Sequence, residues 1–568
     1  MSENRQLAEP RVRSWARVLM FLLAWAFLDC VFNWRFPGNE PAGWYPLPSI
    51  DVAVLLAIFW LVRARGHRVP SWLRFALVLM ALATRIFRFA EGIVERHFHR
   101  ALSLYLDVPL VPNLVALMRS TVSAPRLLFW LALIAIGIAV VSVSAWWALV
   151  ATERAMGFAG PRCLFVIGLA LCVVLSPLWA KRRHPEVHIG LFGRSIVSRL
   201  AGEVSFLRHA AEYRQQKYAS IARTRETLRA MPNKLERLHH ADVLVIVIES
   251  YGQTVIEQPD YARRLAPIYA AFDAELRQHG FTTASSLLSS STYGGRSWLA
   301  HASLRTGVRT EDGLAYAVML DARPPPQTMA DFFRVAGYRT VLVQPGTTAR
   351  KPEGVVAGFD EKYDAMDLDY HGPAFKWATM PDQYVIDFVH RREVARVPEI
   401  ARPPLFVEYD LVSSHSPWSL QPRLVDDWRK LADGGRIFNQ LPPVRYEIGW
   451  ANLASAGEAY LTSVIYDLDV VRRYLAERID DDALVIVLGD HQPSADVTRN
   501  SPSYDVPIHV VSRDRSFIDR FVAAGYVPGM HLGREHAALP METFLPQFVR
   551  MFSNPRVAAS EGAQGATR

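Results

Sequence analysis

The first third of the chain is dominated by long apolar runs. A helix of about 20 largely apolar residues is long enough to cross a bilayer. Leu128 to Val150 and Leu164 to Ala180 meet this length without a charged residue, and Trp15 to Phe32 meets it as well. Pro46 to Val62 and Val69 to about Ala83 are weaker examples. We expect all five segments to span a membrane.

The placement of Arg and Lys predicts how such helices are oriented. The N-terminal arm is basic and lacks a small-residue cleavage site, so we expect an anchor and a cytoplasmic N-terminus. The loop with Arg63, Arg65 and Arg68 would also be cytoplasmic. Five spans then place everything after Ala180 outside the cytoplasm. The basic run Lys181 to Arg183 opposes this scheme and leaves a count of four spans open.

After residue 182 the chain changes character. Residues 183–240 are charge-rich with helical spacing, which predicts a solvated helical connector. Residues 553–568 are rich in Ala, Gly and Ser, which predicts a disordered tail. We therefore divide the chain into a transmembrane domain (1–182), a connector (183–240), a catalytic domain (241–552) and a tail (553–568).

Short apolar runs alternate with amphipathic segments in residues 241–552. The runs that predict strands are Val243 to Ile248, Arg339 to Val343, Leu405 to Tyr409, Ala483 to Leu488 and Pro507 to Val511. The segments that predict helices are Asp260 to His279, Gln327 to Ala336, Asp382 to Arg391, Gly449 to Glu477 and Met541 to Phe552. This alternation favours an α/β domain with a mainly parallel sheet covered by helices. The active site of such a sheet lies beyond the carboxyl ends of its strands.

Composition excludes several kinds of site. The formal charge of +8 is spread thinly, and no basic run is interleaved with aromatic residues in the polar half, so we expect no nucleic-acid partner. The three cysteines, Cys30, Cys163 and Cys172, all fall inside apolar stretches. The polar half therefore has neither a disulfide framework nor a cysteine nucleophile.

Chemically useful residues follow two of the predicted strands. Glu249 comes directly after Val243 to Ile248, and Asp490 with His491 comes after Ala483 to Leu488 and Gly489. A carboxylate oxygen beside an imidazole nitrogen is a common half-site for zinc or manganese. The alternative is a capping or solvent-facing role for each residue.

Two hydroxyl- and imidazole-bearing segments complete the set. Ser297 follows Gly294 and Gly295 at the start of a helical pattern, where backbone N–H groups favour a bound anion. Beside a dication such a serine becomes a nucleophile, although a simple N-cap explains it as well. His415 follows Leu405 to Tyr409 and could contact a phosphate or carry a proton, or simply lie on the surface.

Together these segments resemble the alkaline phosphatase/sulfatase superfamily, and within it the branch of lipoteichoic acid synthases and phosphoethanolamine transferases. The resemblance covers about Ala241 to Phe552, and the branch usually carries five membrane spans ahead of its catalytic domain. It implies one divalent metal ion, manganese or zinc with magnesium as an alternative. The ligands that it implies in this chain are Glu249, Ser297, Asp490 and His491.

The resemblance also suggests which groups react and which bind substrate. Ser297 lies ten residues before Gly307, in the register of the branch's nucleophile, so we favour it over Thr292, which precedes the glycines. His415 matches a substrate-contacting histidine. Trp377, with Asp382 close by, resembles a further substrate segment.

One departure bears on the reaction type. A sulfatase motif has Pro and Arg two and four residues after its modified residue, where this chain has Leu299 and His301. We therefore expect a transferase that moves phosphoglycerol or phosphoethanolamine from a phospholipid donor to an extracytoplasmic glycan or lipid. It would be a multi-pass protein of the cell (inner) membrane. The alternatives are a membrane-bound phosphodiesterase or sulfatase-type hydrolase, and a non-catalytic scaffold that binds glycan or lipid.

Overall fold

The computed structural model describes residues 3–34, 49–112, 115, 124–180, 195–348, 358–375, 377–395, 402–448, 456–479, 482–533 and 536–554. The chain divides into two compact units, one of residues 1–96 and 100–211 and the other of residues 97–99 and 212–568. The main division falls inside helix α8 (Ile196–Ala230). The predicted tail lies, beyond Asn554, outside the described residues.

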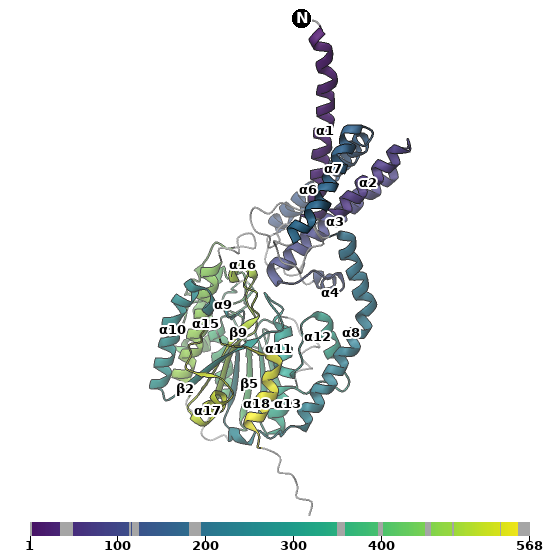
Figure 1. Cartoon of the computed structure of the whole chain (residues 1–568). Coiled ribbons are helices and arrows are strands. Elements are labelled where there is room, and N and C mark those ends of the chain that lie inside the picture. Colours follow the sequence, from purple (N-terminus) through teal and green to yellow (C-terminus); the bar gives the residue numbers. More distant parts are fainter. Residues whose placement is uncertain are drawn as a thin grey trace, which may run out of the picture. The chain divides into compact units, whose positions relative to one another are not determined.

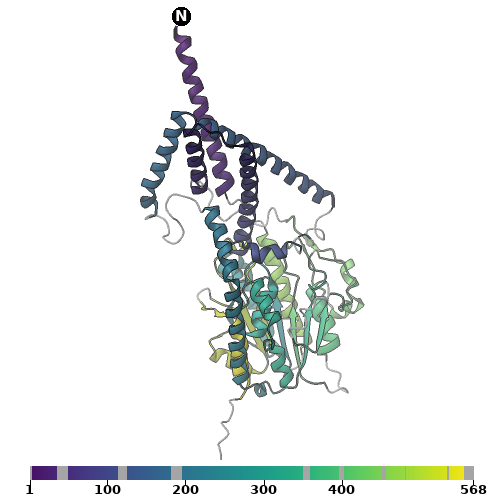
Figure 2. The same cartoon turned by 90° about the vertical axis from the view of Figure 1, so that its right-hand side faces the viewer.

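The first unit is built from helices, which are drawn in purple and blue in Figure 2. They are α1 (Glu3–Asn33), α2 (Ile50–Ala64), α3 (Ser71–Phe98), α4 (Leu104–Asp107), the 3-10 turn η1 (Val108–Leu110), α6 (Ala124–Ala155) and α7 (Ala159–Ala180). The described residues of the five predicted apolar runs lie on these helices, apart from Ser49, Val69 and Pro70 at the starts of two runs. The described part of the N-terminal region is therefore helical, as expected.

Fewer helices are long and apolar enough to cross a membrane than the sequence predicts. Among the described residues, only Trp15–Asn33 within α1 and Ala124–Ala155 as α6 are long and apolar enough to cross a membrane. Helix α6 exposes large apolar side chains such as Leu128 and Val143 (67% and 71% exposed), as a lipid-facing helix does. Helix α2 has only 15 residues, and α3 carries several Arg and Glu residues. The structure supports two such helices where five spans were predicted.

A nine-stranded mixed sheet forms the centre of the second unit. Its strands are β1 (Val243–Ile248), β2 (Thr282–Ser289), β3 (Arg339–Gln344), β4 (Glu361–Asp364), β5 (Leu405–Asp410), β8 (Leu484–Gly489), β9 (Asp505–Ser512), β10 (Val527–Pro528) and β11 (Leu539–Pro540). Their order is β10-β2-β9-β8-β1-β5-β3-β4, with β11 beside β2. Strands β8, β1, β5, β3 and β4 are mutually parallel, whereas β8–β9, β9–β2 and β2–β10 are antiparallel.

The expectation of a mainly parallel sheet thus holds for one half of the sheet only. Sequence patterning missed β2 and the short strands β4, β10 and β11 of this sheet. The longest of them is β2, whose sequence Thr-Thr-Ala-Ser-Ser-Leu-Leu-Ser has no apolar run. Six of its eight residues are nevertheless buried. Small hydroxyl side chains can line a packed sheet when neighbouring strands supply the apolar surface, and this leaves no periodic signal in the sequence.

Helices cover both faces of the sheet (Figure 1). One face packs against α10 (Pro259–Gln278), α14 (Asp382–Val389) and α15 (Gly457–Arg478). The other packs against α11 (Ser297–Thr306), α13 (Met329–Val335), α17 (Arg515–Ala523) and α18 (Phe544–Phe552). In β1, Leu244, Ile246 and Ile248 face the first core and the intervening valines face the second. Burial on both faces explains why the strand is apolar at every position.

Shorter elements connect these layers. They are η2 (Glu236–Leu238), α9 (Thr254–Glu257), α12 (Gly313–Asp321), the π-turn η4 (His390–Val394), β6 (Leu420–Gln421), η5 (Trp428–Asp433), η6 (Arg436–Asn439), β7 (Val444–Arg445), α16 (Ala495–Thr498) and η8 (Met541–Thr543). The predicted helices at Gln327, Asp382 and Met541 appear within a few residues of their expected bounds. Residues 449–455 of the predicted helix at Gly449 lie outside the described residues, and α15 covers the rest.

A buried carboxylate fixes the start of the parallel pair β1–β5. Asp242 is 2% exposed and accepts a 2.8 Å hydrogen bond from the backbone N–H of Leu405. It also forms an ion pair with Arg402. Since Leu405 is the first residue of β5, this contact anchors the register in which Val243 lies opposite Phe406.

Replacing Asp242 with Ala should therefore lower the stability of the second unit. The change leaves a buried N–H and a partly buried guanidinium without this carboxylate, at a cost of about 3 kcal/mol. We expect the thermal unfolding midpoint of the purified protein, followed by circular dichroism, to fall by several degrees. The matched control is Asp260→Ala, which removes an exposed pair with Arg499 and should have little effect. Equal midpoints for the two variants would contradict this role.

Candidate active site

The parallel pairing of β1 with β8 brings together two segments that are far apart in the sequence. Ile248 lies opposite Gly489, so Glu249 and Asp490 emerge side by side at the carboxyl edge of the sheet. A glycine is needed at position 489, because a Cβ there would lie 1.8 Å from the backbone oxygen of Tyr251. This close approach packs the two strand ends against each other.

Four side chains from three segments converge at this edge. The ligand atoms of Glu249, Asp490 and His491 lie within 4.8 Å of one another, and all three residues are buried. The Nε2 atom of His491 is 3.3 Å from Glu249 Oε1 and 3.4 Å from Asp490 Oδ2. The Ser297 hydroxyl donates to Glu249 Oε2 at 2.9 Å and lies 3.1 Å from His491 Nε2. The structure thus assembles all four predicted ligands.

The spacing of these atoms fits a divalent metal ion. Ligand atoms at about 2.1 Å from a tetrahedral zinc ion lie about 3.4 Å from one another, close to the distances observed. Asp490 Oδ1 accepts the backbone N–H groups of Ser250 and His491 at 2.7 and 2.8 Å. Its Oδ2 is buried, and no described residue forms a hydrogen bond with it. A buried carboxylate oxygen without a partner is costly unless a cation neutralises it.

The orientation of His491 agrees with this fit. Its Nδ1 lies 2.7 Å from the backbone carbonyl oxygen of Gln492, which accepts the Nδ1–H and leaves Nε2 for a metal. Two carboxylates, an imidazole and a hydroxyl form a donor set that suits zinc or manganese. These residues would hold one such ion.

Electrostatics within the cluster show an excess of negative charge. Burial opposes ionisation of Glu249, but the hydrogen bond and charge of His491 hold the pKa of the Glu249 carboxyl well below its usual value. Burial and the charge of Glu249 raise the pKa of Asp490 to about 6. Burial would lower the pKa of His491, yet Asp490 and Glu249 raise it to about 9. A dication at the centre would replace the stabilising proton on the imidazole.

A tight turn delivers Ser297 to the cluster. Gly294, Gly295 and Arg296 have φ angles of 70°, 138° and 64°, a conformation that two glycines make accessible. The backbone N–H of Gly294 donates to the Gln492 carbonyl at 3.0 Å, which ties the turn to the segment after His491. Ser297 is the first residue of the ten-residue helix α11, and the N–H groups and helix dipole at a helix start favour an anion.

Thr292 has a different environment. Its hydroxyl donates to the Gly295 carbonyl oxygen at 2.8 Å, within the turn. Thr292 is buried and stabilises the turn, whereas the hydroxyl of Ser297 reaches the ligand cluster. This geometry favours Ser297 as the nucleophile.

The two predicted substrate-binding residues lie against each other. The rings of Trp377 and His415 stack at a centroid distance of 3.5 Å with an interplanar angle of 10°. Burial lowers the pKa of His415, which is close enough to Glu249 and His491 to interact with their charges. The neighbouring Ser414 hydroxyl donates to the backbone oxygen of Glu249 at 2.7 Å. The loop that carries His415 is thus hydrogen-bonded to the segment that holds Glu249, one of the three clustered candidate metal ligands.

Asp382 does not line this region as a substrate-binding residue. It is fully buried, and its carboxylate accepts the backbone N–H groups of Val412 and Ser413 at 3.0 and 2.7 Å. It therefore positions the loop that leads to His415. Asp467, on α15, is a second buried carboxyl group that interacts with Asp382, and it was missed by the sequence analysis. Burial, together with the charge of Asp382, raises the pKa of Asp467 well above its ordinary value. An acidic residue on the apolar face of a helix was the only available signal.

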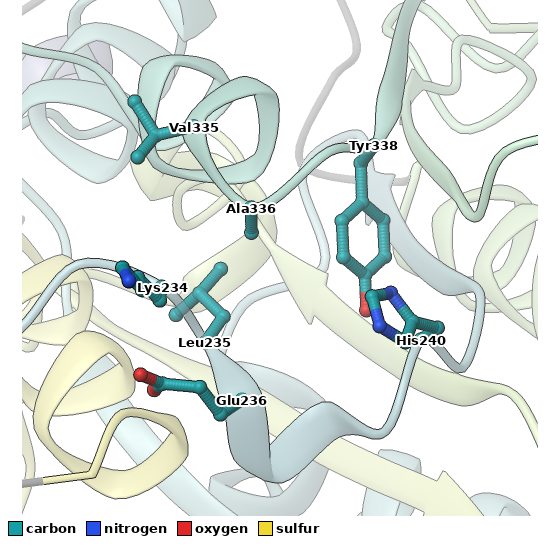
Figure 3. Close-up of a pocket in the computed structure, with 7 residues that line it drawn as sticks. All are labelled: Lys234, Leu235, Glu236, His240, Val335, Ala336 and Tyr338. Atoms are coloured by element: carbon teal, nitrogen blue, oxygen red, sulfur yellow. The ribbon is translucent and has the colours of Figure 1, made fainter.

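A separate pocket of about 270 Å³ lies elsewhere in the second unit (Figure 3). Its lining residues are Lys234, Leu235, Glu236, His240, Val335, Ala336 and Tyr338. His240 and Tyr338 precede β1 and β3, so the pocket lies at the amino edge of the parallel strands. It contributes no residue to the cluster at the carboxyl edge.

Comparison with solved structures finds proteins of the branch that the motifs resemble. The chain is similar to the lipoteichoic acid synthase LtaP from Listeria monocytogenes (14% identity, 48% of this chain and 65% of that chain, TM-score 0.30). It is also similar to the Streptococcus pyogenes phosphoglycerol transferase GacH in complex with sn-glycerol-1-phosphate (12% identity, 61% and 91%, TM-score 0.34). A third is the soluble domain of lipooligosaccharide phosphoethanolamine transferase A from Neisseria meningitidis (13%, 54% and 87%, TM-score 0.33).

The chain thus spans less than two thirds of the length of the LtaP structure. No protein-family model matches the chain, and no curated protein sequence matches it. Identities and TM-scores this low carry no information about residue roles. The chemistry proposed for this chain therefore rests on its own site geometry.

Replacing Asp490 with Asn tests the metal site directly. The amide keeps an oxygen for the two backbone N–H groups but removes the charge, so we expect bound zinc or manganese to be lost. The raised pKa of Asp490 means that the folded state disfavours its charge when no metal is bound. In EDTA at pH 8, the variant should therefore unfold at a temperature at least as high as that of the wild type. Metal content by mass spectrometry and thermal unfolding with and without zinc provide the two measurements.

The control for this experiment is Asp519→Asn, an exposed residue on α17. It should keep the wild-type metal content and the wild-type stabilisation by zinc. An Asp490→Asn protein with full metal content would exclude Asp490 as a ligand.

Proposed function

We propose that the chain is a membrane-anchored, metal-dependent transferase. It moves phosphoglycerol or phosphoethanolamine from a phospholipid donor to an extracytoplasmic glycan or lipid. The observation that carries the proposal is the position of Ser297. This residue is the first of helix α11, and its hydroxyl contacts both Glu249 and His491 within one buried cluster. A hydroxyl among metal-type ligands at a helix N-terminus is suited to attack a phosphate ester.

In the first step, Ser297 Oγ attacks the phosphorus atom of the donor. A bound dication supplies charge neutralisation for the hydroxyl and for the phosphate. The serine proton can pass to Glu249, whose Oε2 already accepts the Ser297 hydroxyl at 2.9 Å. The bond between phosphorus and the diacylglycerol oxygen breaks, and diacylglycerol leaves with a proton. The head group is then held as a phosphodiester on Ser297.

In the second step, a hydroxyl of the acceptor attacks the same phosphorus atom. The Ser297–phosphorus bond breaks, the product phosphodiester leaves, and Ser297 recovers its proton. The N–H groups at the start of α11 are oriented to stabilise the phosphoryl oxygens. His415 and Trp377 would bind the head group from the neighbouring loop, because His415 lies close to Glu249 and His491 and stacks on Trp377.

The membrane helices suit a donor that resides in the bilayer. We propose an odd number of spans, which places the catalytic unit outside the cytoplasm at the cell (inner) membrane. A hydrolase that uses water as the acceptor would employ the same residues, and product analysis separates the two. The complete ligand set argues against a non-catalytic scaffold.

Substitution of Ser297 tests the covalent mechanism. Ser297→Ala removes the attacking oxygen, so head-group release from a phospholipid should fall by several orders of magnitude. Ser297→Thr keeps a hydroxyl and should retain part of the activity. Mass spectrometry of tryptic peptides from the wild type incubated with phosphatidylglycerol or phosphatidylethanolamine should reveal a head-group adduct on the Ser297 peptide.

Thr292→Ala serves as the matched control, because it removes a nearby hydroxyl that stabilises only the turn. It should be much milder than Ser297→Ala. The opposite ranking, with an adduct on Thr292, would place the nucleophile five residues earlier.

The span count predicts where the catalytic unit lies. A reporter that is active only outside the cytoplasm, fused after Arg183, should give signal if the number of spans is odd. An even number of spans would place the same junction in the cytoplasm, and a cytoplasmic reporter alone would then be active. That result would be incompatible with an extracytoplasmic acceptor.

A further inference from the structure

A second histidine accompanies the nucleophile on helix α11. His301 lies four residues after Ser297, so the two side chains share one face of the helix. His301 is 8% exposed, and its Nδ1 lies 3.2 Å from Asp410 Oδ2 at the end of β5. The sequence analysis gave this residue no role, and the transfer reaction as proposed does not use it.

The carboxylate that holds His301 is itself firmly fixed. Arg305 donates to both oxygens of Asp410 at 2.9 and 2.8 Å, and Gln344 donates to Oδ2 at 2.8 Å. Burial opposes ionisation of Asp410, but Arg305 and His301 keep its pKa well below its ordinary value. An anionic Asp410 therefore accepts the Nδ1–H of His301. A carboxylate behind Nδ1 is the usual support of a histidine that binds metal through Nε2.

The opposite nitrogen of His301 points toward a metal ligand. Its Nε2 lies 3.9 Å from Asp490 Oδ2. Within the described part of the chain, both atoms are buried and lack a hydrogen-bond partner. Two atoms that each lie about 2.1 Å from one cation can be at most about 4.2 Å apart, so the spacing accommodates an ion between them.

This ion would differ from the first one. His301 is outside the group of Glu249, Asp490 and His491, whose ligand atoms all lie within 4.8 Å of one another. Asp490 belongs to both arrangements, and a carboxylate can bridge two metals. Paired ions about 3.5–4 Å apart recur in enzymes that transfer phosphoryl groups.

We propose that His301 Nε2 and Asp490 Oδ2 form a second divalent-cation subsite, with Asp490 bridging it to the first ion. The proposal rests on the proposed function, because it requires the first cation at Glu249, Asp490 and His491. Only two protein ligands serve the second ion, so water or phosphate oxygens supply the others. The second ion therefore binds more weakly than the first, and phosphate strengthens its binding.

Counting manganese ions on the full-length protein tests the subsite. The detergent-solubilised, metal-free protein is dialysed against Mn²⁺ with and without inorganic phosphate, and bound Mn²⁺ is measured by electron paramagnetic resonance. We expect two ions per wild-type chain in phosphate, with spin coupling between them. His301→Ala should bind one uncoupled ion with the affinity of the first site. Asp410→Asn should weaken the second ion about 10- to 100-fold, as loss of a supporting carboxylate does.

Two further variants separate ligation from packing. His301→Gln keeps a side chain of similar shape with a poorly ligating amide, so it should also bind a single ion. His390→Ala removes another buried histidine, one that contacts Tyr474 away from the cluster, and should still bind two. One ion on the wild type in phosphate, or two on His301→Ala or His301→Gln, would overturn the subsite. A wild-type chain that binds no Mn²⁺ would instead overturn the proposed metal-dependent function.

Discussion

The register between β1 and β8 is the constraint on which the candidate site depends. With Ile248 opposite Gly489, the residue after each strand lies at the same edge, and Glu249 meets Asp490 and His491. These residues are about 240 positions apart, as shown by the hydrogen bond from Ser250 to Asp490. A shift of one residue in a strand turns its side chains to the opposite face, so the cluster requires this register. The two apolar cores, one on each face of β1, hold the register in place.

The cluster concentrates buried charge that the fold alone does not balance. Glu249 and Asp490 share a site with one imidazole, and the raised pKa values of both Asp490 and His491 reflect that imbalance. Buried ions of this kind destabilise a protein unless they are paired or bind a cation. A dication relieves the imbalance and makes the same charges useful for attack on a phosphate ester. The site thus exchanges stability of the metal-free protein for reactivity.

Helix α11 connects the proposed nucleophile to the other side chains of the candidate site. It begins at Ser297 after a turn that depends on Gly294 and Gly295, and four residues later it presents His301. Arg305, one turn further, reaches Glu408 and Asp410 on β5. Because one rigid element carries all three side chains, the distance between the nucleophile and the Asp410–His301 pair is fixed by helical geometry. The loop with His415 is fixed separately, through Asp382 and Ser414.

The sequence by itself determined the elements whose signal is local. Apolar runs located β1, β3, β5, β8 and β9. The polar residues after β1 and β8 are the metal ligands that we propose, and sequence can mark them because they follow a buried strand. Other features depend on partners distant in sequence. Strand β2 has hydroxyl-rich sequence and is buried only by its neighbours. The sequence favoured Ser297 over Thr292 by motif register alone, and only the turn geometry gives the physical reason, because it directs the Thr292 hydroxyl to the turn and the Ser297 hydroxyl to Glu249. Likewise, the partners of Asp382 and His301 lie at or just after the end of β5, and they come into contact only in the folded chain. Such tertiary hydrogen-bond partners leave no local pattern in the sequence.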